Sequence, residues 1–131
     1  MATTDMVIEI ENDQPGELAK VASALSDSGV NIAAATALGS GQKAELHVLV
    51  PHPEAVRHAL AVVHSVSVTR EREVAVVQVH DQPGELADLA GRIAAAGVNL
   101  DIVYVATGSR VVFGSDDLEG LKAALAGADV L

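Results

Sequence analysis

The chain has 131 residues, of which 18 are acidic and 8 basic, giving a formal net charge of -10 at pH 7. A chain with this negative charge repels phosphate backbones and anionic lipid headgroups. Neither nucleic acid nor a membrane is therefore an expected partner. Cysteine is absent, which excludes disulfides and thiolate metal sites. The first residues lack the pattern of a secretory signal, and no apolar run reaches the roughly 18 residues of a membrane span. We therefore expect a cytoplasmic protein.

An internal repeat determines the predicted domain organisation. The sequence DQPGELA at residues 13–19 recurs unchanged at residues 81–87, and GVNI at 29–32 recurs as GVNL at 97–100 with the same spacing. A seven-residue identity at a fixed spacing indicates duplication of a structural module. We expect one module over residues 1–71 and a second over residues 72–131.

The first copy reads as strand, helix, strand, strand, helix, strand. Alternation of apolar and acidic residues predicts a half-buried strand at 6–11, and Pro15 with apolar residues at helical spacing predicts a helix over 15–28. Strands are predicted at 30–38 and 44–50 around a glycine-rich turn, a helix over 53–63 and a strand at 66–71.

The second copy repeats this order with small changes. Strands are predicted at 74–79, 98–106 and 110–114, and helices over 83–96 and 116–126. Only residues 129–131 remain for the last strand, which leaves two alternatives, a frayed strand or none. This copy has three residues fewer, which we assign to the hairpin turn, and residues 71–73 read as a solvated linker. Two βαββαβ units predict an α+β fold of ferredoxin-like modules, each with helices on one face of a four-stranded antiparallel sheet.

The repeated polar residues form the candidate ligand site. Asp13 and Asp81 precede a helix N-terminus whose unpaired N–H groups can hold a carboxylate or phosphate, and Gly16 and Gly84 leave room for such a ligand. An Asn at the start of the following strand, Asn31 or Asn99, offers both a donor and an acceptor. The alternative interpretation is structural: helix capping by Asp, packing at Gly and a turn at Asn.

D-x-P-G-x-L-A between a strand and a helix, followed by G-V-N-I, resembles the ACT domain, a regulatory module of enzymes such as 3-phosphoglycerate dehydrogenase, aspartate kinase and phenylalanine hydroxylase. The resemblance covers nearly the whole chain, twice. It implies modules paired in a side-by-side eight-stranded sheet, with a small effector, often an amino acid, bound between the first loop of one module and the second strand of its neighbour. One implied site joins Asp13, Gln14, Gly16, Glu17 and Leu18 with Asn99, Leu100 and Asp101; the other joins Asp81, Gln82, Gly84, Glu85 and Leu86 with Asn31 and Ile32.

The serine-binding form of this loop has a His two residues before an Asn, where this chain has Glu11 before Asp13 and Val79 before Asp81. This departure argues against serine as the ligand. The five histidines lack the spacing of a metal site, no phosphate-binding glycine loop occurs, and the repeated polar cluster lacks a nucleophile paired with a base. No cofactor, metal or catalytic residue is predicted.

These observations predict a regulatory protein that binds a small-molecule effector, with an amino acid as the expected ligand, forms a homodimer and acts in trans on a protein partner or metabolic enzyme. Action in trans is expected because no catalytic or DNA-binding segment accompanies the two modules. Two alternatives remain open: a ligand-free oligomerisation or interaction module, and a small enzyme on a ferredoxin-like scaffold.

Overall fold

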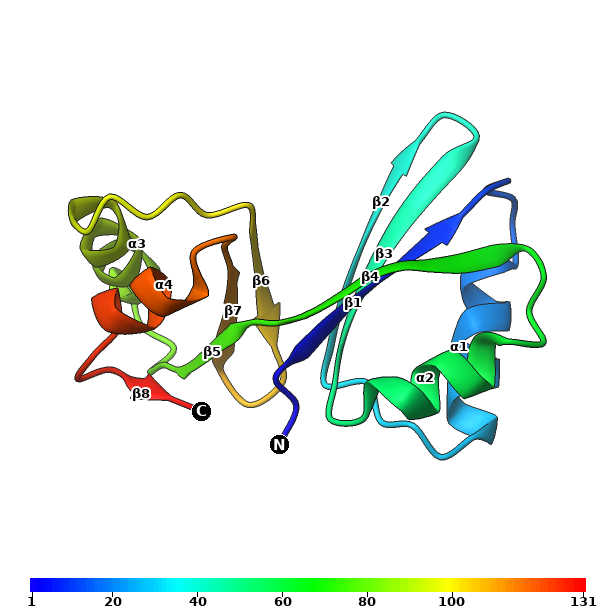
Figure 1. Cartoon of the computed structure of the whole chain (residues 1–131), viewed down its shortest axis with the longest axis horizontal. Helices are drawn as coiled ribbons and strands as arrows, with labels where there is room; N and C mark the ends of the chain where they lie inside the picture. Colours follow the sequence, from blue (N-terminus) through cyan, green and yellow to red (C-terminus); the bar gives the residue numbers. More distant parts are fainter. The chain divides into compact units, whose positions relative to one another are not determined.

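The computed structural model describes residues 1–131, which fold as two compact units, Met1–Arg72 and Glu73–Leu131. Both units have the order strand, helix, strand, strand, helix, strand (Figure 1). None of the helices combines the length and apolar character that crossing a membrane requires.

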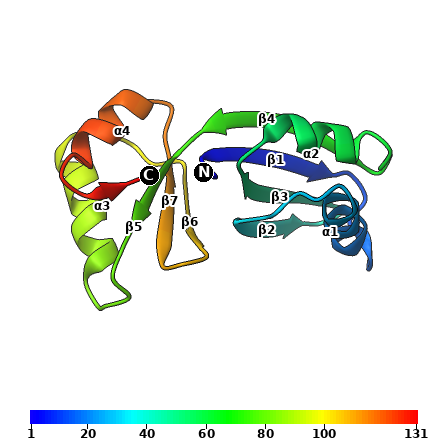
Figure 2. The same cartoon turned by 90° about the horizontal axis from the view of Figure 1, so that it is seen from below.

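The first unit is a four-stranded sheet with two helices on one face (Figure 2). Its elements are β1 (Thr4–Ile10), α1 (Glu17–Asp27), β2 (Ala34–Ser40), β3 (Lys43–Val50), α2 (Pro53–Leu60) and β4 (Val66–Glu73), and the strand order is β2-β3-β1-β4. Because side chains alternate along a strand, Met6, Ile8 and Ile10 all point to the helix face, where they are at most 3% exposed. They pack with α1 and α2 in one core.

The second unit repeats this arrangement. Its elements are β5 (Ala75–Gln78), α3 (Glu85–Ala95), β6 (Ile102–Ala106), β7 (Arg110–Gly114), α4 (Leu118–Ala124) and β8 (Asp129–Val130), in the sheet order β6-β7-β5-β8. Phe113 lies at the centre of the core, with Ile93 of α3 and Leu121 of α4. The last strand is present, although short, and Val130 pairs with Val77. The predicted α+β class with two ferredoxin-like modules is confirmed.

The first helix of each unit, α1 or α3, is shorter than predicted, and the strand that follows it begins later than predicted. Each helix begins two residues later than expected, because Gly16 and Gly84 have positive φ and lie outside the helix. Strands β2 and β6 begin four residues later than expected, so Asn31 and Asn99 lie in loops and not at strand starts. At the end of α1, Val30 N–H donates to Leu25 O over 2.9 Å, which closes the helix where the strand was predicted.

Residues 71–73 join the two units and Glu71 and Glu73 are exposed, as expected, but these residues form the end of β4 and not an irregular linker. Glu71 forms an ion pair with Arg57, and Glu73 lies 3.3 Å from Lys122 Nζ. The charged residues fit an edge strand, where one side of the backbone has no neighbouring strand and charge discourages pairing with other chains. A single residue, Val74, separates β4 from β5.

Candidate functional site

The repeated loop reaches its helix through a glycine in a left-handed conformation. Gly16 has φ +96° and Gly84 has φ +94°, and neither helix has a side chain bound at its N-cap. A Cβ at either position would meet no atom within 4 Å, so backbone conformation and not crowding requires glycine here. The alternative interpretation of Asp13 and Asp81 as helix caps is therefore wrong, and both carboxylates remain candidates for a ligand.

In the first unit, the β2–β3 hairpin holds this loop. Asp13 N–H donates to Gln42 O in the hairpin turn over 2.5 Å. An Asp13 carboxylate oxygen lies 3.4 Å from the position that a side chain would take on Gly39. The long hairpin thus lies directly against Asp13.

In the second unit, the corresponding hairpin is shorter. Ala34 pairs with Leu49 at the base of the first hairpin and Ile102 with Gly114 at the base of the second, so the second contains three residues fewer. The predicted position of the missing residues is confirmed. The main-chain contact of the shorter turn is with Val79, two residues before Asp81, where the Val79 N–H donates to Ser109 O over 2.9 Å. The side chain of Gln78 also donates to Gly108 O, over 2.6 Å.

A cavity of about 300 Å³ lies between this loop and the short hairpin. Asp81, Gln82, Glu85 and Leu86 of the predicted set line it, together with Val79, His80, Val105, Ala106, Ser109, Arg110 and Val111. The hairpin residues were missed from the sequence, because strand pairing and not spacing brings them to the loop. The lining combines the carboxylates of Asp81 and Glu85, the guanidinium of Arg110 and several aliphatic side chains, which suits a small amphipathic ligand.

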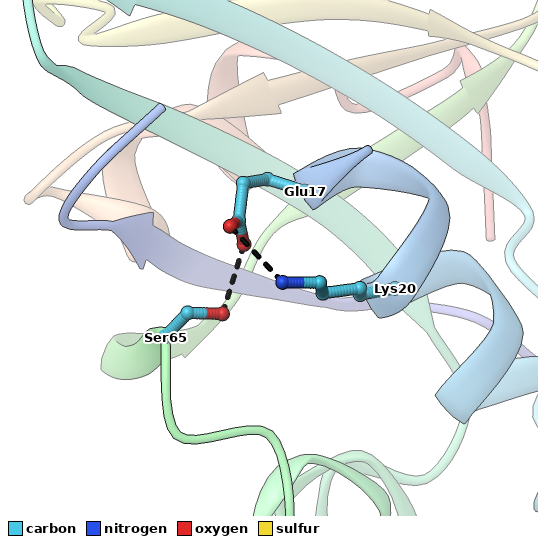
Figure 3. A network of polar contacts seen from close by, with 3 residues as sticks. All are labelled: Glu17, Lys20 and Ser65. Atoms are coloured by element: carbon cyan, nitrogen blue, oxygen red, sulfur yellow. Dashed lines mark hydrogen bonds and ion pairs between the residues drawn. The ribbon is translucent and has the colours of Figure 1, made fainter. Parts of the chain in front are cut away.

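The two equivalent glutamates have different partners. Glu17 is 7% exposed and accepts hydrogen bonds from Ser65 Oγ over 2.8 Å and from Lys20 Nζ over 3.3 Å (Figure 3). The Ser65 bond lowers the pKa of Glu17, partial burial opposes it, and Lys20 lowers it further. Glu85 instead accepts from His80 N–H over 3.1 Å, at the cavity. Glu17 thus ties α1 to the residue before β4, whereas Glu85 lies at the candidate site.

The remaining predicted residues lie at the far end of the first helix of each unit. Helix α1 has 11 residues, a rise of about 16 Å, and it separates Asp13 from Asn31. Helix α3, of the same length, separates Asp81 from Asn99. The structure therefore does not bring the loop and the asparagine of one unit together. Ile32 and Leu100 pack against the cores of their own units.

The main chain at Asn99 has a support that Asn31 lacks. Ser115, 7% exposed, donates from Oγ to Asn99 O over 2.7 Å and accepts from Asp117 N–H over 3.1 Å. The residue that follows β3 in the first unit is Pro51, which has no hydroxyl to donate. The two candidate sites are thus built differently despite identical loop sequences. No group of three or more metal-ligating side chains is found together.

Two βαββαβ units with a left-handed glycine at the entry to each first helix define a tandem module of ferredoxin-like type. Residues 6–68 match the ACT domain family. This match lies within the first unit, and the second unit repeats the same fold and the same loop sequence.

Solved structures with similar folds cover almost the whole chain. Protein BT0572 from Bacteroides thetaiotaomicron has a TM-score of 0.87 at 24% identity, over 100% of this chain and 92% of that one. The ligand-free regulatory subunit of aspartate kinase from Thermus thermophilus has a TM-score of 0.71 at 20% identity, over 95% and 91%. The corresponding subunit from Thermus flavus has a TM-score of 0.61 at 19% identity, over 95% and 92%. Among curated proteins, none matches the chain in sequence.

Proposed function

We propose that this protein is a regulatory protein that binds a small-molecule effector, an amino acid, through the repeated loops and acts in trans on a protein partner. The observation that carries the proposal is the cavity in the second unit, which is lined by Asp81, Gln82, Glu85 and Leu86 of the repeated loop. Two of the similar solved structures are regulatory subunits of aspartate kinase, which supports a regulatory role on a separate chain.

The proposed site residues are the loop residues and the asparagines predicted from the sequence. Asp81 is suited to an ammonium group, and the N–H groups of the first turn of α3 are suited to a carboxylate. Since α1 and α3 each separate loop from asparagine, a ligand bound by both residue types needs residues of two units. The predicted pairing of each loop with the asparagine of the other copy stays a prediction.

A thermal-shift screen of the twenty amino acids against the full chain tests the proposal. A ligand that binds only the folded state raises the free energy of unfolding by mass action, by about 2.7 kcal/mol when its concentration is 100 times its Kd. The melting temperature rises as a result. We expect at least one amino acid to raise the melting temperature at millimolar concentration. If none does, the effector proposal fails and a ligand-free interaction module becomes the better description.

Asparagine variants show whether the distal residues take part. We expect Asn99→Ala and Asn31→Ala to reduce the shift that the bound amino acid produces. Both side chains are exposed in loops, so unfolding of the unliganded variants serves as the control and is expected to match the parent protein.

A further inference from the structure

The cavity of the second unit has an aliphatic wall. Its lining includes four larger aliphatic side chains: Val79, Leu86, Val105 and Val111. Two of these side chains remain largely open to solvent, with Leu86 50% and Val105 69% exposed. Large aliphatic side chains that stay exposed around a concave surface mark a place where an apolar group of a ligand is buried.

The first unit has a smaller residue where the second has Val105. In the β6–β7 hairpin, Val105 is the third residue after Ile102 and pairs with Val111. In the β2–β3 hairpin, the equivalent residue is Ala37, the third after Ala34, which pairs with Leu46. The larger aliphatic side chain at this position is thus specific to the second unit, whereas at the next position Ala106 of the cavity corresponds to Leu38 of the first unit.

The polar part of the cavity and its volume point to a free amino acid. Asp81 offers a carboxylate to an ammonium group, and Arg110, which also lines the cavity, offers a guanidinium to a carboxylate. A volume of about 300 Å³ is at the lower end of the roughly 300–1,000 Å³ of small-molecule sites. A zwitterion with a short aliphatic side chain satisfies the charges, the wall and the size together.

We propose that the second unit binds an α-amino acid with an aliphatic side chain and that Val105 and Leu86 determine this specificity. The proposal rests on the proposed function and names the ligand class of the same site. Val105 is not among the site residues that were predicted from the loop motif. It acts by removing apolar ligand surface from water, at roughly 25 cal/mol per Å².

Isothermal titration of the full chain tests the proposal, with L-valine, L-leucine and L-isoleucine compared with L-serine and L-asparagine. We expect the aliphatic amino acids to bind more tightly than the polar ones. Val105→Ala is expected to weaken their binding about tenfold, since loss of apolar contact in a pocket costs on that order. The matched control is Val103→Ala on the same strand, 42% exposed and outside the cavity, which leaves the affinity unchanged.

A second pair of variants compares the two copies of the motif. Leu86→Ala is expected to weaken binding, whereas Leu18→Ala, at the same motif position of the first unit and 55% exposed, is not. All four substituted side chains are exposed, so the variants are expected to fold.

Each remaining outcome overturns the proposal. If only polar amino acids bind, or if Val105→Ala binds like the parent protein, the ligand class is wrong while the effector function stands. If Val103→Ala and Val105→Ala weaken binding equally, the strand acts through association of chains and not through the cavity. If no amino acid binds, the proposed function fails as well.

Discussion

At the scale of residues, identical side chains in the two copies form different hydrogen bonds because their neighbours differ. Glu17 meets Ser65 and Lys20, whereas the residue three positions after Glu85 is Asp88, with a charge opposite to that of Lys20. Glu85 therefore turns to the His80 amide. A seven-residue identity predicted equivalent loops, but the contacts of each glutamate depend on residues outside the motif.

A histidine on β3 is predicted to make stability depend on pH. His47 Nδ1 lies 2.9 Å from Asp5 Oδ2, and this hydrogen bond raises the pKa of His47 above its ordinary value of 6.5, against partial burial. A raised folded-state pKa contributes stability that is fully present below the unfolded pKa and is lost as pH rises through the folded pKa. We expect the melting temperature to fall as pH rises from about 6 to about 9, with part of that fall removed in His47→Gln.

Thermal denaturation across this pH range measures the effect. His52→Gln is the control, because that side chain is 73% exposed and lies 3.9 Å from its nearest carboxylate, so its profile is expected to follow the parent protein. Parallel pH profiles for the parent and His47→Gln would show that the contact with Asp5 does not contribute.

At the scale of elements, the period and order of helices and strands could be predicted, but their ends could not. Helix α1 was expected from Pro15, yet the left-handed conformation of Gly16 delays its start. Strand β2 was expected from Val30, yet the hydrogen bond from Val30 N–H to Leu25 O ends the helix there first. Apolar periodicity detects which face is buried, whereas an element's end depends on single backbone hydrogen bonds.

Two glycines of the second unit are predicted to respond oppositely to alanine. Gly84→Ala is expected to lower the free energy of unfolding by about 1–2 kcal/mol, because an L side chain in the left-handed region clashes with its own backbone. Gly91→Ala, inside α3, is expected to raise it by about 0.5–1 kcal/mol, since a Cβ there meets no atom within 4 Å and alanine costs less entropy. Urea unfolding measures both, and equal effects of the two changes would contradict the assignment of Gly84.

At the scale of the whole molecule, the sheet of each unit has an edge strand that belongs to its hairpin. β2 and β6 lie at sheet edges, and β6 carries the exposed Val103 and Val105. An edge strand presents a row of unpaired backbone N–H and C=O groups, with which a strand of another chain can pair. The homodimer expected from the sequence stays a prediction, and pairing through such an edge is one way to form it.

We predict that light scattering after size exclusion gives twice the 13.4 kDa mass of the chain. Unfolding coupled to dissociation makes the melting temperature rise with protein concentration, which is an independent measurement of the same state. A mass of one chain with a melting temperature independent of concentration would contradict the prediction.

The sequence by itself determined the duplication, the α+β class and the position of the loops, because these follow from local identity and from the period of apolar residues. Only the tertiary structure decided that the hairpin of the second unit is too short to hold Asp81 as that of the first holds Asp13. It also decided that a helix separates each loop from its asparagine. The physical reason is that strand pairing joins residues far apart in the chain, and a change of three residues in one turn alters which of them meet.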